Sequence, residues 1–410
     1  LSSTFVTYLA GLGIERSRTP RAKKTFLTSS IVINLSILFI FKYFNFAAES
    51  LTVLLDTLGL SLQMPKFKLL LPVGISFYIF QALGYAIDVY RGETAAEKNF
   101  FTYALFVSFF PQLVAGPIER STRLLPQFKK KQAFLYDNLM TGLRMMVWGY
   151  FLKLVLADHC ALYVDAIFNN YTYHNGGSFL LASLLFTFQI YGDFAGYSLI
   201  AIGAAKIMGF SLMENFKRPY FATTISDFWH RWHISLSTWF KDYVYISLGG
   251  NRVRSPRQYF NLLTTFALSG IWHGANWTFV AWGLLHGLWL CLEKGLGWHK
   301  TQWKGGRKLL HWILTFGLVC LFWIFFRAAS IGEAGHIIRG IFTDFGMPYI
   351  RPTVFLGLFF AFWILIAKDI TEEFALNIHI ADSPHWLVRH LYLIFMTAFI
   401  LLFGVLDGSQ

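Results

Sequence analysis

One histidine in an apolar stretch of this sequence is well suited to acid–base chemistry. His273 lies between Trp272 and Gly274, and Gly270 precedes it by three positions. A neutral imidazole in such surroundings must find partners inside the protein, and it can act as a general base near neutral pH. The two glycines permit a close backbone approach or a helix break, which opens room for a ligand beside the ring. The residues alone therefore leave two interpretations open, a merely satisfied buried histidine and a catalytic base.

A pair of histidines lies about forty positions earlier, in a Trp-rich segment over residues 225–240. His230 and His233 are three apart, so one turn of a helix would present both imidazoles on one face. An interfacial helix with incidental histidines is the competing interpretation. His286 follows His273 by 13 positions, and on an unbroken helix the rise separates them by about 20 Å. We therefore do not expect His273 and His286 to act as a pair.

Other polar side chains interrupt the apolar runs, and a structural role is favoured for each. Ion pairs and helix-end anchors are the usual reasons for such residues in membrane helices. Lys153 and Asp158 are predicted to pair across a helix. The cysteines have no paired or metal-type spacing, so neither a disulfide framework nor a metal site is expected. The residues concerned are Asp88, Arg91, Gln112, Asp158, His159, Gln189, Asp193, Arg327, Cys160, Cys291 and Cys320.

The elements that position these residues are predicted from composition. Of the 410 residues, 55% are hydrophobic and 14% charged, whereas soluble domains carry about 25% charged residues. Apolar runs of about 20 residues recur and are long enough to cross hydrocarbon. We expect one all-α integral membrane domain over residues 1–410, with about nine to eleven transmembrane helices. The sequence begins with Leu1 rather than Met, so a first hydrophobic segment is expected to be missing.

The net charge of +13 arises from short basic bursts between the apolar runs. This pattern is typical of cytoplasmic loops that face anionic lipid, so no nucleic-acid partner is expected. The bursts at 129–131 and 252–257 could also attract the phosphates of coenzyme A, although the positive-inside rule explains them without a ligand. The first two bursts, at residues 16–24 and 120–131, are separated by three apolar runs at about residues 26–46, 69–89 and 100–115. Because an odd number cannot return to the same side, one run must be re-entrant or one burst misassigned.

Several separate blocks of the sequence resemble one known family, in order, between about residues 24 and 340. The chain is similar to the membrane-bound O-acyltransferases, and most closely to the membrane subunits of bacterial alginate and peptidoglycan O-acetylation. The first hydrophobic segment of that branch is missing here, and His230 precedes Arg231 where two arginines are commoner. The blocks are residues 71–78, 87–92, 110–118, 191–198, 213–216, 228–252 and 272–277.

The resemblance implies a fold and a site. The fold would be a ring of helices around a central chamber, with interfacial amphipathic helices. His273 matches the family histidine deep in the chamber and would be the general base, and His233 matches the second family residue. Either His233 or Asn276 would orient the base or bind the oxyanion. The remaining candidates for substrate contacts are Ser235, Asn251 and Arg252.

The resemblance also implies a reaction. An acetyl group would pass from a cytoplasmic thioester, expected to be acetyl-CoA, to a hydroxyl of an extracytoplasmic polysaccharide such as alginate or peptidoglycan. No permanently bound cofactor is expected. The expected partner is an extracytoplasmic SGNH-type esterase or acetyltransferase, and the expected location is the bacterial cytoplasmic membrane. The alternatives are a transporter or channel, a noncatalytic scaffold for such an esterase, and D-alanyl transfer to teichoic acid.

Overall fold

The computed structural model describes residues 1–60, 64–70, 72–113, 116–350, 352–376, 380–381 and 383–406. Three residues of the family-like blocks, Leu71, Val114 and Ala115, lie outside these ranges. The described elements are all helical, as predicted, and η1, η2 and η5 are π-helical. In chain order they are α1 (Ser2–Arg16), α2 (Pro20–Leu38), η1 (Phe39–Tyr43), α3 (Phe44–Thr57), α4 (Ile75–Arg91), α5 (Phe100–Ser108), α6 (Ser121–Phe128), α7 (Tyr136–Tyr150), η2 (Phe151–Ala157), α8 (Asp158–Phe168), η3 (Tyr171–Tyr173), α9 (Gly176–Ile207), η4 (Pro219–Phe221), α10 (Ile225–Arg231), α11 (Ile234–Phe240), η5 (Lys241–Tyr245), α12 (Ser255–His273), α13 (Trp277–Gly295), η6 (Trp298–Lys300), α14 (Gly305–Arg327), α15 (Ile331–Thr343), α16 (Pro352–Glu373) and α17 (Trp386–Phe403).

Within the described ranges, five helical stretches are long and apolar enough to cross a membrane. They confirm an all-α membrane protein, while the predicted total of nine to eleven crossings stays a prediction. In the described part of the run at residues 100–115, namely residues 100–113, the helix is α5, whose nine residues are too few to span about 30 Å of hydrocarbon. The expectation that one run is re-entrant or one burst misassigned stays a prediction. The five stretches are Pro20–Thr57, Gly176–Ile207, Gly305–Arg327, Val354–Glu373 and Trp386–Phe403.

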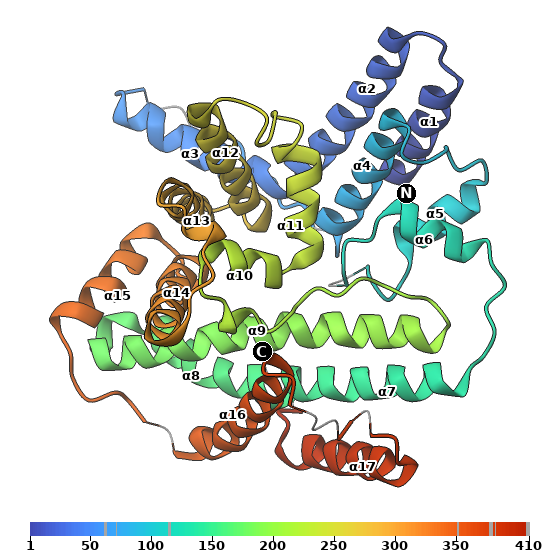
Figure 1. Ribbon diagram of the computed structural model, residues 1–410. Coiled ribbons are helices and arrows are strands. Elements are labelled where there is room, and N and C mark those ends of the chain that lie inside the picture. Colours follow the sequence, from blue (N-terminus) through green and yellow to red (C-terminus); the bar gives the residue numbers. More distant parts are fainter. Residues whose placement is uncertain are drawn as a thin grey trace.

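The centre of the fold is a pair of antiparallel helical rods. Figure 1 shows α7 and α8 end to end along the full length of α9. Small residues let the rods approach closely, since a Cβ on Gly149 would lie 2.6 Å from the carbonyl oxygen of Gly196. Lys153, in η2, bonds Asp158 and Asp193 at 2.8 Å each, which confirms the predicted pair. The helices α14 and α15 pack near one end of this pair of rods, and α16 and α17 lie beneath it (Figure 1).

The helices α12 and α13 form a hairpin whose tip is residues 274–276. Gly274 has extended backbone, and Asn276 caps α13 by accepting a hydrogen bond from Thr278 N at 3.0 Å. The two helices touch at Gly270, where a Cβ would lie 2.2 Å from the carbonyl oxygen of Phe279. The expected glycine-assisted helix break therefore occurs, and it reverses the chain directly after His273.

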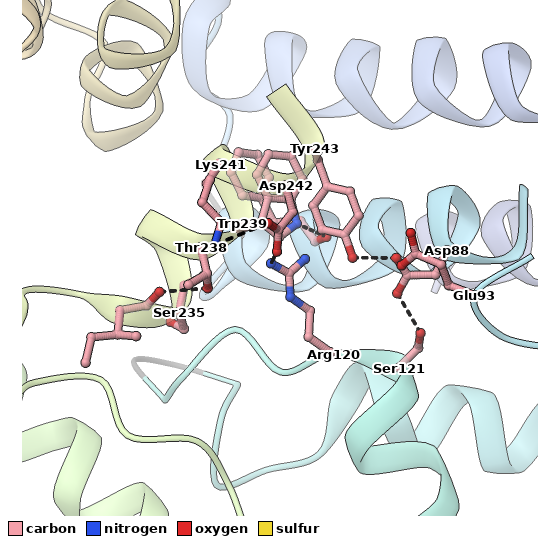
Figure 2. A network of polar contacts seen from close by, with 12 residues as sticks. Asp88, Glu93, Arg120, Ser121, Ser235, Thr238, Trp239, Lys241, Asp242 and Tyr243 are labelled. Atoms are coloured by element: carbon pink, nitrogen blue, oxygen red, sulfur yellow. Dashed lines mark hydrogen bonds and ion pairs between the residues drawn. The ribbon is translucent and has the colours of Figure 1, made fainter. Parts of the chain in front are cut away.

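A polar network, drawn in Figure 2, fixes η5 against α4 and α6. Buried Asp88 accepts hydrogen bonds from Tyr243 Oη at 2.6 Å and Ser121 Oγ at 2.9 Å. Arg120 donates to a carboxylate oxygen of Asp242 at 2.9 Å, and its guanidinium lies 4.4 Å from the centroid of the Tyr243 ring. The predicted anchoring role of Asp88 is thus confirmed. The network holds the segment that leads from α11 to the hairpin.

Candidate active site

His233 lies at a break between two short helices. Helix α10 ends at Arg231, Trp232 is extended, and His233 adopts left-handed backbone (φ 43°) as the N-cap of α11. The expectation that His230 and His233 share one face of one helix is wrong, because this left-handed residue turns the chain between them. Left-handed backbone is uncommon outside glycine. The break buries the His233 side chain, with its ring centroid 4.5 Å from that of Phe194.

The hydrogen bonds of Asn215 determine which nitrogen of the His233 ring carries the proton. Its Oδ1 accepts hydrogen bonds from both the backbone N (3.2 Å) and the Oγ (2.9 Å) of Ser235. Because a backbone N–H can only donate, this Asn215 atom is the oxygen, so His233 Nδ1, 3.1 Å away, must donate to it. In the neutral ring the lone pair is then on Nε2, which is buried and has no partner among the described residues. The free nitrogen of His233 is therefore an acceptor.

His273 is the last residue of α12 and stands in an aromatic box. Its ring centroid lies 4.9 Å from Trp272, 5.1 Å from Trp282 and 5.2 Å from Phe326. The centroid of the His233 ring is 6.4 Å away. Two imidazoles forty positions apart in sequence thus share one site. The structure brings together the two histidines that the sequence nominated as catalytic.

His286 contacts Trp282, one of the aromatic residues around His273. Its ring centroid is 5.0 Å from that of Trp282, which also contacts His273 at 5.1 Å. The expected separation of about 20 Å along one helix is wrong, because the hairpin folds α13 back along α12. Fully buried His286 accepts a hydrogen bond at Nδ1 from Trp229 Nε1, 3.2 Å away. His286 therefore holds the Trp229 side chain in place by this hydrogen bond.

A cavity of about 360 Å³ lies between α10, α11, α12 and α13. Its walls include the apolar side chains of Leu236, Leu262 and Phe266. It reaches Ile234, next to His233, and Ser269, one helical turn before His273. Cationic and imidazole side chains also line it, namely Lys241, Lys294, His299 and His230. The cavity thus connects a basic region to the immediate neighbourhood of both histidines.

The predicted contact residues have different places in the structure. Asn251 lines the cavity, where its Oδ1 accepts from Tyr245 Oη (2.7 Å) and Lys294 Nζ (2.8 Å). Arg252 is exposed and does not line the cavity. His230 also lines the cavity and donates from Nδ1 to the Ser226 carbonyl at 2.6 Å.

Two further candidates hold the local backbone. Fully buried Ser235 fixes Asn215, as described above. Asn276 donates from Nδ2 to the carbonyl oxygen of Ala329 at 2.9 Å, which leaves one N–H of that amide for another acceptor. Its substrate contact, like that of Ser235, stays a prediction.

The sequence interpretation missed several residues of the site. Asn215 stands within a family-like block, but its spacing alone gives no sign of a bond to His233. Lys241, Lys294 and His299 have no spacing that separates them from ordinary loop residues. Lys42 gave a usable signal, since a lysine inside the 38-residue apolar stretch Pro20–Thr57 is costly at membrane depth.

A second cavity, of about 400 Å³, lies beside α7, α9 and α16. Asn215 and Ser198 form part of its lining, and Asn215 Nδ2 donates to Ser198 Oγ at 3.1 Å. Charged side chains surround it, among them Arg144, Lys217, Arg218, Lys368, Asp369 and Glu372. This second cavity therefore extends to Asn215, the residue that binds His233 Nδ1.

The sequence matches the model of the MBOAT, membrane-bound O-acyltransferase family over residues 93–332. It is 41% identical over 342 residues to the probable alginate O-acetylase AlgI of Pseudomonas syringae pv. tomato, covering 83% of this chain and 65% of that protein. It is 36% identical to the peptidoglycan O-acetyltransferase of Helicobacter pylori, covering 83% and 69%. It is 30% identical to the teichoic acid D-alanyltransferase of Bacillus subtilis, covering 64% and 70%. The chain spans about two thirds of the length of these relatives. On the extent of the family match and of these identities, the chain belongs to the membrane-bound O-acyltransferase family.

Proposed function

We propose that this protein transfers an acetyl group from a cytoplasmic thioester to a hydroxyl of an extracytoplasmic polysaccharide, in the cytoplasmic membrane of a bacterium. The observation that carries the proposal is the pairing of His233 with His273, 6.4 Å apart between ring centroids, near a cavity that has basic side chains and reaches Ile234 and Ser269. A hydroxyl needs a base to attack a thioester at neutral pH, and a neutral imidazole in an aromatic enclosure can serve.

The chemical step uses His273 as the general base. The acceptor oxygen attacks the thioester carbonyl carbon while its proton passes to the imidazole. The new C–O bond forms, the C–S bond then breaks, and the departing thiolate takes up the proton. General base catalysis of this kind contributes about a hundredfold to ten-thousandfold.

His233 supports the step as an acceptor. Because His233 donates its Nδ1–H to Asn215 Oδ1, the lone pair of the neutral His233 ring is on Nε2, which has no partner among the described residues. Such a nitrogen can accept the N–H of the neighbouring His273 ring and so orient the base. Donation to an oxyanion would require His233 to be charged in a buried place, which is costly. An orienting role is therefore the better supported of the two roles.

The donor is proposed to enter through the cavity between α10 and α13. An apolar passage of about 360 Å³ suits a narrow thioester arm, and Lys241, Lys294 and His299 can meet phosphates. Acetyl-CoA has both features. Lys294 and Asn251 also adjoin the basic bursts that the positive-inside rule assigns to the cytoplasmic side. The direction of entry therefore agrees with a cytoplasmic donor.

The names of the relatives support the proposed class of acceptor. Identities of 41% to an alginate O-acetylase and 36% to a peptidoglycan O-acetyltransferase favour a polysaccharide acceptor. The 30% identity to a D-alanyltransferase makes D-alanyl transfer the weaker alternative. An extracytoplasmic SGNH-type esterase or acetyltransferase is proposed to complete delivery to long polymer.

A transport assay separates this proposal from a transporter, a channel or a scaffold. Purified protein is reconstituted in vesicles with acetyl-labelled acetyl-CoA on one side and soluble alginate or peptidoglycan fragments on the other. We expect base-labile ester label on the acceptor, and stoichiometric free coenzyme A on the donor side. Passage of intact acetyl-CoA without ester would establish a transporter, and neither product, even with a partner esterase added, would favour a scaffold.

A further inference from the structure

Lys42 makes an unusual set of contacts for a residue of an apolar span. It lies in the π-helical segment η1, and its Nζ donates to the carbonyl oxygen of Trp272 and to Ser76 Oγ, 3.2 Å away. The ammonium is also 5.6 Å from the centroid of the Trp272 ring. The next residue, Tyr43, donates from its hydroxyl to the carbonyl oxygen of Ile271 at 3.0 Å. Two consecutive side chains thus bind the end of α12, about 230 positions away in sequence.

The end of α12 needs such donors. The last four carbonyls of any α-helix lack intrahelical partners. A left-handed glycine often closes a helix by supplying backbone N–H groups to them, but Gly274 is extended (φ −161°) and begins the tip of the hairpin instead. Lys42 and Tyr43 supply two of the missing donors to Trp272 and Ile271. The positive charge of Lys42 also complements the negative end of the helix dipole.

The same contacts connect three elements around the base. Ser76 belongs to α4, and the ring of Phe77 on that helix lies 5.5 Å from the Trp272 ring. An ammonium inside a membrane span is costly and tends to mark function, as does π-helical geometry within a helix. Trp272 is directly followed by His273, so its backbone position decides where the imidazole stands.

We propose that Lys42 is a positioning residue for acyl transfer: by holding the C-terminus of α12, it fixes the imidazole of His273 against its aromatic box. Tyr43 has the same role with a weaker, uncharged contact. The inference rests on the proposed function for its activity readout. A misplacement of about 1 Å at a reacting group can cost about a hundredfold in rate. Loss of the contact should therefore lower kcat and leave donor binding largely intact.

The first test compares turnover of matched variants in the vesicle assay. Lys42→Met keeps length and removes the charge and all donors, and we expect kcat to fall at least about thirtyfold while KM for acetyl-CoA changes less than about threefold. Lys42→Arg, which keeps charge and donors, should retain at least about a third of wild-type kcat. Exposed Lys24, on the same helical span, serves as the control, and Lys24→Met should match wild type. A kcat for Lys42→Met within threefold of wild type, or no rescue by arginine, would overturn the proposal.

The second test does not depend on turnover. Carbethoxylation of His273 by diethylpyrocarbonate is followed by mass spectrometry in equally folded samples, with exposed His230 as the internal reference. We expect Lys42→Met to speed labelling of His273 at least about fivefold relative to His230, because the freed helix end exposes the ring. An unchanged ratio would refute the positioning role. If wild type forms no ester but this ratio rises, the proposed function fails and the role of Lys42 stands.

Discussion

The ring of His233 lies 6.4 Å from that of His273, centroid to centroid, and its Nδ1 is bound to Asn215. The bond turns the free Nε2 of His233 into an acceptor beside the proposed base. These contacts bring three segments together: the left-handed break after α10, the loop that contains Asn215, and the tip of the α12–α13 hairpin. Each of the three has consequences that can be measured.

Replacement of His233 should affect turnover more than replacement of His230. His233→Ala removes the acceptor that orients the base, and we expect kcat to fall between about tenfold and a thousandfold, roughly 1.4 to 4 kcal/mol. His230 lines the cavity and its Nδ1 is bound to the Ser226 carbonyl, so His230→Ala should raise KM for acetyl-CoA a few fold at most. Both variants are compared in one vesicle assay at equal folded amounts. A larger kcat loss for His230→Ala would show that the orienting role belongs to His230 instead.

Removal of the Asn215 acceptor should cost both activity and stability. Asn215→Ala leaves the Ser235 backbone N–H, the Ser235 hydroxyl and His233 Nδ1–H without their shared partner. Each unsatisfied buried donor costs about 1–3 kcal/mol, so a lower melting temperature in detergent and at least about tenfold less turnover are expected. Asn215→Asp retains an oxygen acceptor and should keep more of both. Equal losses of stability and turnover in the Asn215→Ala and Asn215→Asp variants would contradict the role of the Asn215 oxygen as the shared acceptor.

The basic lining of the donor cavity should govern substrate affinity. Lys294→Ala is expected to raise KM for acetyl-CoA about threefold to tenfold, which corresponds to about 1 kcal/mol, and the increase should shrink at high salt. Exposed Lys304 lies ten positions after Lys294 and is not part of the cavity lining, so Lys304→Ala provides the control. Equal effects of the two changes would mean that only the general positive charge of this side attracts the donor.

The contact between α12 and α13 should tolerate no side chain at Gly270. A methyl group there would lie 2.2 Å from the Phe279 carbonyl oxygen, so Gly270→Ala must push the helices apart. A loss of about 1–3 kcal/mol in stability and a larger loss of turnover are expected. A methyl group on Gly317, in α14, would meet no atom of the described residues within 4 Å, and Gly317→Ala should be neutral or slightly stabilising. Thermal unfolding in detergent compares the two, and equal melting temperatures would contradict the close contact.

Part of this site could be predicted from sequence because its signals are local. The apolar runs indicate membrane helices, and the polar interruptions around His233 and His273 indicate a site. The glycines beside His273 also indicated a possible helix break. The resemblance to one family then selected these two histidines over His230 and His286.

The rest depends on contacts between distant segments. The bond between Lys42 and Trp272 links residues 230 positions apart, and no periodicity predicts it. The left-handed backbone of His233 is uncommon for any residue other than glycine, so a continuous helix was the natural expectation. The same assumption of continuity placed His286 too far from His273. In each case tertiary packing, rather than local preference, decided the geometry.

The central claim is that His273 is the general base, and one comparison tests it most directly. Ester formation from labelled acetyl-CoA is measured for wild type and His273→Ala in the same vesicles, after melting temperatures confirm equal folding. The account predicts near-normal stability and at least about a hundredfold less ester, the low end for general base catalysis. Ester formation by His273→Ala within a few fold of wild type would contradict it.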